Sequence, residues 1–252
     1  MVSCSRATLY HYRIWSANLS RRTMVHCKLL QLNPNHRLAN ESKMNRDIER
    51  GKCSILGNQE WSVLPWRNFT KDSLQELFDI GFMLAAVLEE VDLCESGDTS
   101  VIRLESLSSG CQGVRQRFHV WYNDYSAIGI GPELDSVQYE NPAQLRFTSM
   151  WDASIAVHYW LFQLIMQDIT FRSLQFIPAG ASAFDNGYGL TLANNIVMSS
   201  SFLLTEDLGW LGPQRLFFPL RRSLEVLAKA RSPLVADAQA AFKTLVTRLR
   251  GG

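Results

Sequence analysis

The chain has 252 residues, of which 46% are hydrophobic and 19% are charged, and its formal net charge is +1. These values indicate a globular protein of one large domain or two small ones, and the net charge points to no particular partner. The sequence excludes a membrane-spanning chain, because no uncharged apolar run reaches the roughly 18 residues that a bilayer requires.

Cysteine spacing argues against a metal site. The five cysteines are Cys4, Cys27, Cys53, Cys94 and Cys111. None lies within three residues of another, so the paired spacing of structural zinc sites is missing. An odd number of scattered cysteines, without a secretory signal peptide, indicates reduced thiols in the cytosol or nucleus. We therefore expect neither a metal nor another cofactor.

The first 52 residues are basic. They hold ten Lys or Arg against three acids, a net charge of +7, which leaves −6 for residues 53–252. Three interpretations stay open: a flexible basic arm, a mitochondrial transit peptide, and translated sequence without a role. With aromatic rings between its cations, the segment would contact nucleic acid at most weakly and without specificity.

Residues 33–59 are polar and are interrupted by Gly51 and Gly57. We expect a linker there, with one short helix from Ser42 to Arg50. The expected organisation is therefore a largely disordered basic segment over residues 1–58, followed by a folded domain over residues 59–252.

Candidate N-cap residues at 70–73 precede a strongly amphipathic helix. Glu89, Glu90 and Asp92 are expected at the exposed end of this helix. Carboxylates without a partner group are poor evidence of acid–base catalysis, so no catalytic role is predicted for them. Residues 92–113 are expected to be irregular. Cys111 lies there between glycines, but His119, eight residues on, has no fixed contact with it, so no nucleophile is predicted.

Residues 115–125 are predicted to form a helix or a strand, and Gly129 to Pro132 a turn. A second strong helix is predicted over residues 146–177, with an apolar stripe at Trp151, Ile155, Tyr159, Phe162 and Met166. Its apolar character places it at the centre of a bundle. His158 on this helix would line a ligand pocket or pack in the core with a hydrogen bond, and the sequence favours the core.

The C-terminal third reads as helices separated by breaks. Residues 178–181 break the chain and residues 185–189 are expected to form a tight turn. A helix should then run from Ala193 to Leu204, and Gly209 should end it in the left-handed conformation. Gly212-Pro213 is expected to be a second break, with Pro219 in the first turn of the next helix. The closing helix is predicted from Pro233 to Arg250.

The expected fold is therefore all-α, with helices packed in antiparallel pairs as an irregular bundle or a short array of helical pairs. No internal repeat of fixed period requires a regular solenoid. Neither βαβ alternation nor a useful period-2 run appears, which argues against an α/β enzyme fold.

Three segments carry a family resemblance. The first is Trp61-Ser62-Val63-Leu64-Pro65-Trp66, followed by the helix LQELFDIGFMLAAVLEEVD, and the second runs from Phe147 through His158-Tyr159-Trp160-Leu161. The third, at the C-terminal end, combines A..I..S..FL, G..G and FPL..S...L between Ala193 and Leu227. Together they resemble the regulatory domain of fungal six-cysteine zinc-cluster transcription factors, over about three quarters of the chain. The cluster of six closely spaced cysteines is not in this sequence.

The resemblance implies a transcription regulator that is not an enzyme, that acts in the nucleus (or in cytoplasm and nucleus), and that controls metabolic or secondary-metabolite genes. Its expected partners are other transcription factors or co-regulators, and a small-molecule effector. Without a zinc cluster or a heptad coiled coil it would act through partners, or be a truncated product. Under this interpretation the basic segment is the arm that joins a DNA-binding head to the regulatory domain.

The alternative is an all-α enzyme or a small-molecule-binding protein with an unrecognised pocket. An enzyme of this class would carry an acidic metal cluster, H-E-x-x-H or G-x-S-x-G, and none of these occurs. A pocket, if present, is expected between the helix of residues 151–166 and that of residues 194–204, with Trp151, His158 and Trp160 as candidate lining residues.

Overall fold

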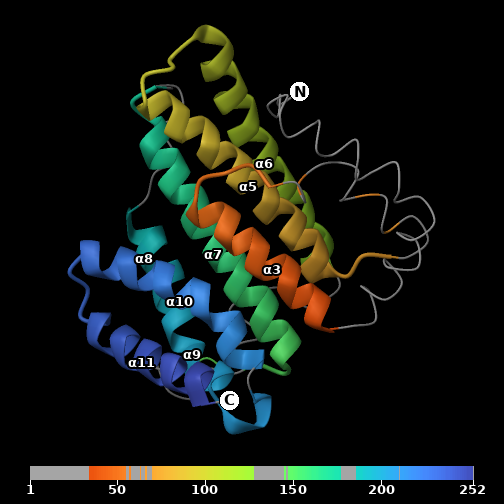
Figure 1. Cartoon of the computed structure of the whole chain (residues 1–252), viewed down its shortest axis with the longest axis vertical. Helices are drawn as coiled ribbons and strands as arrows, with labels where there is room; N and C mark the ends of the chain where they lie inside the picture. The colour runs from red at the N-terminus through yellow and green to blue at the C-terminus, as the bar shows by residue number, and fades with distance from the viewer. Residues whose placement is uncertain are drawn as a thin grey trace. The chain divides into compact units, whose positions relative to one another are not determined.

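The computed structural model describes residues 34–54, 57, 63, 66, 70–127, 145, 147–176, 186–209 and 211–251. All regular structure in these residues is helical, which confirms the all-α prediction (Figure 1). The basic segment up to residue 33, the Gly129–Pro132 turn and the break at 178–181 lie outside the described residues. The helices are α3 (Pro34–Glu49), α5 (Ser73–Glu95), α6 (Val101–Ala127), α7 (Met150–Ser173), α8 (Asn186–Met198), α9 (Ser200–Leu203), α10 (Leu211–Lys229) and α11 (Val235–Gly251), with the 3₁₀ turn η5 (Glu206–Leu208) before α10.

Contacts divide the chain into two compact units that meet between Val114 and Arg115, inside α6. The first unit holds α3, α5 and the first half of α6. The second holds the rest of α6 and the helices from α7 to α11. The boundary therefore falls within a helix rather than in a linker.

In the first unit, α5 begins where its cap residues predict. Asp72 is the N-cap, and its carboxylate accepts a hydrogen bond of 2.9 Å from the amide of Gln75. The apolar face of α5 is buried, and α3 packs against this helix. Met44 and Ile48, four residues apart on α3, are 0% and 5% exposed. The short helix expected from Ser42 to Arg50 is thus a longer, packed helix that starts at Pro34, and residues 34–54 are not a simple linker.

The stretch 92–113, expected to be irregular, is mostly the first half of α6. The prediction was wrong because glycines were interpreted as breaks. A Cβ on Gly110 would lie 3.1 Å from Cγ2 of Val87, tighter than normal packing. Gly110 therefore allows α6 to lie close to α5, and its role is close packing within a helix.

Three helices end in the same hydrogen-bonded motif. After α3, α5 and α10, the residues Gly51, Gly97 and Arg231 have φ values of 54°, 108° and 53°. In each case the next amide donates to the carbonyl five residues earlier, at 3.0–3.1 Å. This is the Schellman motif, in which glycine is the usual left-handed residue. Arg231 occupies the one such position that carries a side chain.

We expect Arg231→Gly to stabilise the protein by about 1 kcal/mol, because the left-handed conformation strains a residue that has a Cβ. Urea unfolding of the full chain measures the change. Arg231→Ala removes the same charge but keeps the Cβ, so its stability should stay near that of the original protein. Equal stability of the glycine and alanine variants would contradict the strain.

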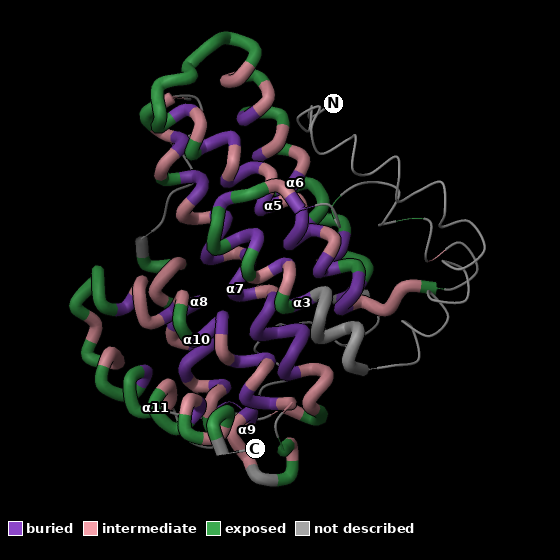
Figure 2. The backbone as a smooth tube through the Cα atoms, viewed as in Figure 1, coloured by how far each residue is buried: buried purple, intermediate pink, exposed green. Residues whose placement is uncertain are grey.

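In the second unit α7 is the central helix. Ser149 caps it, accepting a hydrogen bond of 3.1 Å from the amide of Asp152. The helix predicted over residues 146–177 is thus confirmed, with bounds at Met150 and Ser173. It packs against both α8 and α10, and it is buried along most of its length (Figure 2). Among the described residues, no helix combines the length and apolar character of a membrane span.

The helix expected from Ala193 to Leu204 begins earlier and is divided. Residues 186–189, expected to be part of a tight turn, form the first turn of α8, and Asp185 lies outside the described residues. α8 ends at Met198, and the short α9 follows Ser199. Gly209 has a φ of 54°, which confirms its left-handed conformation, although it follows η5 rather than the helix itself.

The two prolines of α10 were assigned the wrong roles. Gly212-Pro213, expected to break the chain, lies in the first turn of α10, and Pro219, expected in the first turn, lies in the helix interior. Pro213 takes the N-terminal position, where a missing N–H costs nothing. Pro219 is buried within the helix, and its carbonyl accepts a 3.0 Å hydrogen bond from the Ser223 hydroxyl.

α11 closes the unit and packs against α10, with bounds close to the predicted Pro233–Arg250. Ala238 and Leu245, on its inner face, are fully buried. The rings of Phe217 and Phe242 join the two helices at 5.5 Å between centroids. A short connection makes these two helices an antiparallel pair, as the sequence predicts.

Candidate functional sites

His158 is a core residue of α7. Its side chain is fully buried, and its Nδ1 lies 2.7 Å from the carbonyl oxygen of Ser154, one turn earlier on the same helix. Its ring meets Phe162 edge-on at 6.1 Å. This is the packed, hydrogen-bonded arrangement that the sequence favours over a pocket-lining role.

The three candidate pocket residues do not share one wall. Trp151 is half-buried, and Trp160 is 3% exposed, with its ring 6.4 Å from Phe147. At about 100° per residue, Trp151 and His158 lie on one side of α7, and Trp160 lies on the opposite side. The structure therefore brings two of them to one face and separates the third.

A cluster of aromatic rings surrounds Tyr159 on α7. Trp121 and Tyr122 of α6 stack on Tyr159 at 5.6 and 5.7 Å between centroids, and Phe118 meets it edge-on at 6.2 Å. Tyr125 extends the cluster, stacked on Trp121 at 5.0 Å. The sequence predicted a helix or a strand over residues 115–125, but it did not pair Phe118, Trp121 and Tyr122 with α7. Their spacing of three and four residues, which marks one face of a helix, was the available signal.

These surroundings keep the phenols neutral. Burial raises the pKa of Tyr159, with smaller effects from Tyr188 and Tyr122. Burial, with a smaller effect from the Asp152 carboxylate, raises the pKa of Tyr125 to about 12. Partial desolvation raises the pKa of Tyr188 as well, although this residue is 39% exposed. A phenol with a raised pKa does not act as a base near neutral pH, so the cluster stabilises the fold and offers no acid–base chemistry.

We expect the protein to lose stability as the pH rises above about 10. There the unfolded chain loses phenolic protons that the folded chain retains, which favours unfolding. Tyr159→Phe keeps the ring and removes the hydroxyl, so it should move the alkaline unfolding midpoint upward. Circular dichroism between pH 8 and 12, with absorbance of the ionised phenols as a second signal, checks this. An unchanged midpoint would exclude Tyr159 as a source of the alkaline instability.

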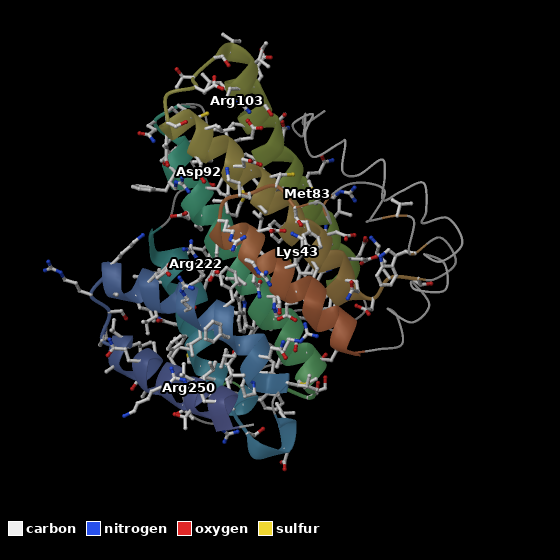
Figure 3. The ribbon with its side chains drawn as sticks, viewed as in Figure 1. Lys43, Met83, Asp92, Arg103, Arg222 and Arg250 are labelled. Carbon is white, nitrogen blue, oxygen red and sulfur yellow. The ribbon has the colours of Figure 1, made fainter. Side chains whose placement is uncertain are left out.

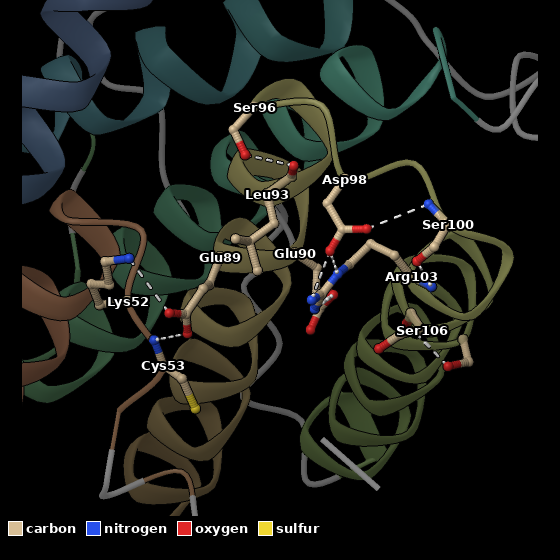
Figure 4. Close-up of polar contacts among 11 residues, drawn as sticks. Lys52, Cys53, Glu89, Glu90, Leu93, Ser96, Asp98, Ser100, Arg103 and Ser106 are labelled. Carbon is tan, nitrogen blue, oxygen red and sulfur yellow. Dashed lines mark hydrogen bonds and ion pairs between the residues drawn. The ribbon is translucent and has the colours of Figure 1, made fainter. Parts of the chain in front are cut away.

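A charged cluster joins α5 and α6 within the first unit (Figure 4). The Arg103 guanidinium donates to the Glu90 carboxylate at 2.7 Å and to that of Asp98 at 3.1 and 3.2 Å. Glu90 is only 7% exposed, so its expected place at an exposed helix end was wrong. Asp92 is exposed, as expected. Sequence reasoning missed the pair because Arg103 lies across a turn, 13 residues further on.

Glu89 makes a second connection, to the segment that follows α3. Its carboxylate accepts a 2.9 Å hydrogen bond from the amide of Cys53 and lies 3.5 Å from Nζ of Lys52 (Figure 4). Neighbouring carboxylates of α5 thus bind different elements of the first unit. These contacts connect α5 to the segment after α3 and to α6.

Cys94 and Cys111 are poorly placed to act as nucleophiles. Cys94 is 1% exposed, and burial, together with the Glu90 carboxylate, raises the pKa of its thiol. Cys111, the candidate between glycines, is a buried residue of α6. A protonated, buried thiol does not react readily. Among the described residues, no three His, Cys, Asp or Glu side chains are grouped to hold a metal ion.

No known protein family, no characterised protein and no solved structure matches the chain.

Proposed function

We propose that the chain is the regulatory domain of a transcription regulator of the fungal zinc-cluster type, acting by binding and not by catalysis. One observation carries the proposal: most of the residues that resemble this family at the C-terminal end are interior residues, the exceptions being the half-buried Phe202 and the exposed Gly209. In FPL..S...L, all five residues are buried on α10. They are Phe218, Pro219, Leu220, Ser223 and Leu227.

Four of the five residues of A..I..S..FL follow the same rule, and Phe202 is half-buried. Ala193, Ile196, Ser199 and Leu203 are all fully buried on α8 and α9 or between them. The Ser199 hydroxyl donates to the carbonyl of Asn195 at 2.8 Å, so this serine needs no partner from another helix. Small residues at such positions allow helices to approach closely. The resemblance therefore rests on a packing pattern, the property that relatives of one fold share even when their surfaces differ.

The proposed domain works in the nucleus and controls metabolic or secondary-metabolite genes through other transcription factors, co-regulators or a bound effector. A regulatory domain of this kind needs a stable helical scaffold and a surface for partners, and it needs no catalytic group. The buried His158, the neutral tyrosines and the paired carboxylates fit that requirement, since each one stabilises the fold.

A reporter assay tests the proposal. Residues 1–252 are fused to an unrelated DNA-binding domain, and transcription from its promoter is measured in a fungal host. We expect transcription to change several-fold relative to the DNA-binding domain alone. The Gly189→Ala fusion should behave like the original, since a Cβ there meets no described residue within 4 Å, whereas a fusion with the destabilising change Gly212→Ala should lose the effect. Unchanged transcription at equal nuclear protein level contradicts the proposal.

Two further measurements test whether this role involves an upstream DNA-binding segment, a small-molecule effector or protein partners. Mapping the 5′ end of the transcript shows whether an upstream exon supplies six closely spaced cysteines. Thermal unfolding in a panel of pathway metabolites detects an effector, because a ligand at 100 times its Kd stabilises the folded state by about 2.7 kcal/mol. An absence of shifts across the panel would favour control through protein partners.

A further inference from the structure

The C-terminal helical pair carries an unbalanced charge. Residues 229–252 hold five basic side chains and one acidic side chain, Asp237. None of the five cations forms an ion pair with another described residue. They are Lys229, Arg231, Lys243, Arg248 and Arg250.

Two cations of α10, Arg221 and Arg222, differ in this respect, because both lie next to carboxylates. Arg222 of α10 lies 2.7 Å from the carboxylate of Glu225 and 3.8 Å from that of Asp168, and Arg221 lies 3.7 Å from Glu225. Figure 3 labels Arg222 on α10 and Arg250 at the end of α11. Arg222 thereby connects α10 to α7, whereas the five cations of residues 229–252 leave their charge open to an external anion.

The outer face of α11 presents part of this charge. Lys243 and Arg250 are exposed and seven residues apart, so they lie on one side of the helix, opposite the buried Ala238 and Leu245. Arg248 is half-buried on the flank. The other exposed positions of this outer face are uncharged and either small or polar: Ala236, Gln239, Ala240 and Thr247. Three further residues of α11 are exposed away from this face: Asp237 and Thr244 lie on the flank, and Leu249 lies toward the side of Leu245.

Arg231 adds a second observation. It is exposed in the turn that leads to α11, and its φ of 53° is a conformation that favours glycine. A strained residue held on the surface suggests a role for its side chain outside the fold. The helix dipole accounts for cations in a last turn, here Lys229, Arg248 and Arg250. It accounts for neither Arg231 nor Lys243.

We propose that the α10–α11 turn and the outer face of α11 form a docking surface for the phosphate backbone of nucleic acid. Phosphate contacts need cations and small polar groups, and this face provides both. A protein partner of comparable affinity would need large apolar anchors, which the outer positions of α11 lack. The contact carries no base specificity, and it does not depend on the proposed regulatory role.

Fluorescence anisotropy of a labelled 20-base-pair duplex of arbitrary sequence, titrated with the full chain between 50 and 200 mM salt, tests the surface. The triple variant Lys243→Gln, Arg248→Gln, Arg250→Gln should reduce the slope of log K against log salt by about 2 to 3, since each lost phosphate contact contributes about 0.9. Arg221→Gln removes one charge from a paired cation of the same unit and should leave the slope unchanged. The basic N-terminal segment is the same in all variants, so it cancels in the comparison.

Arg231→Gly separates binding from folding, because it should weaken duplex binding while it raises stability. Polyglutamate serves as the protein-like polyanion in a second titration. The proposal fails if the triple variant binds the duplex with the original slope, or if its slope falls no more than that of Arg221→Gln. It fails as well if polyglutamate binding depends on these cations and duplex binding does not, which would indicate an acidic protein segment as the partner.

Discussion

Gly212→Ala should destabilise the protein by about 3 kcal/mol, the largest effect that we expect from the loss or gain of one methyl group. A Cβ at this position would overlap the carbonyl oxygen of Leu203 at the end of α9, and it would lie 3.0 Å from the carbonyl carbon and 3.3 Å from Cβ of Leu208. The obstacle is mainly backbone, which cannot rotate away as a side chain can. The first turn of α10 would have to move, and Leu216 and Leu220, fully buried on α10, would move with it.

Gly189→Ala is the matched control. Gly189 is also in the first turns of a helix, α8, but in the described part of the chain no atom lies within 4 Å of where its Cβ would be. Alanine should therefore be neutral or stabilise by up to about 1 kcal/mol, since it restricts the unfolded chain. Urea unfolding of both variants gives the comparison. If they lose equal stability, the close approach of α10 to Leu203 is not a feature of the protein in solution.

The helices that the sequence predicted well are those with local signals. Asp72 and Ser149 cap α5 and α7, and the apolar stripes of these helices are long enough to define their type. The glycines and prolines were interpreted less well, because their role depends on what lies beside them. Gly110 and Gly212 allow close packing, and nothing in the nearby sequence distinguishes that use from a turn.

The contacts of the charged side chains depend even more on tertiary structure. Glu90 resembles any carboxylate near a helix end until α6 brings Arg103 against it. The aromatic cluster forms only when α6 and α7 pack so that Trp121 and Tyr122 lie against Tyr159. By contrast His158 was assigned to the core, and its buried ring and backbone hydrogen bond agree with that. Periodicity therefore predicted which side chains lie inside, and it could not predict which partners they find.

Arg103→Met should destabilise the protein by about 2 kcal/mol. The change leaves the Glu90 carboxylate, 7% exposed, without the guanidinium that compensates its burial. Breaking a buried pair from one side costs more than replacing both partners, because one charge is left uncompensated. The double variant Glu90→Met, Arg103→Met should thus be more stable than the sum of the single changes predicts. Urea unfolding of the four proteins gives this cycle.

Asp98 provides the control for the exposed side of the cluster. Hydrogen bonds from Ser100 and Arg103 hold the pKa of the Asp98 carboxyl below its ordinary value. A lowered pKa contributes stability above about pH 4, and this contribution is lost as the pH falls through the lowered pKa. Asp98→Asn should therefore be slightly less stable than the original protein at pH 7 and equal to it near pH 2. Because Asp98 is exposed, its effect at pH 7 should be much smaller than that of Arg103→Met.

The order of these effects distinguishes a buried cross-link from a surface ion pair. If Arg103 mainly stabilises the ionised Asp98, Arg103→Met should destabilise the protein only slightly. This destabilisation should disappear in acid, together with that of Asp98→Asn. If Arg103 mainly pairs with Glu90, Arg103→Met should destabilise the protein strongly at pH 7. The double-mutant cycle should then show strong coupling between Glu90 and Arg103. The 2.7 Å contact to a nearly inaccessible carboxylate favours the second result. The first unit would then depend on this pair to hold the start of α6 against the end of α5.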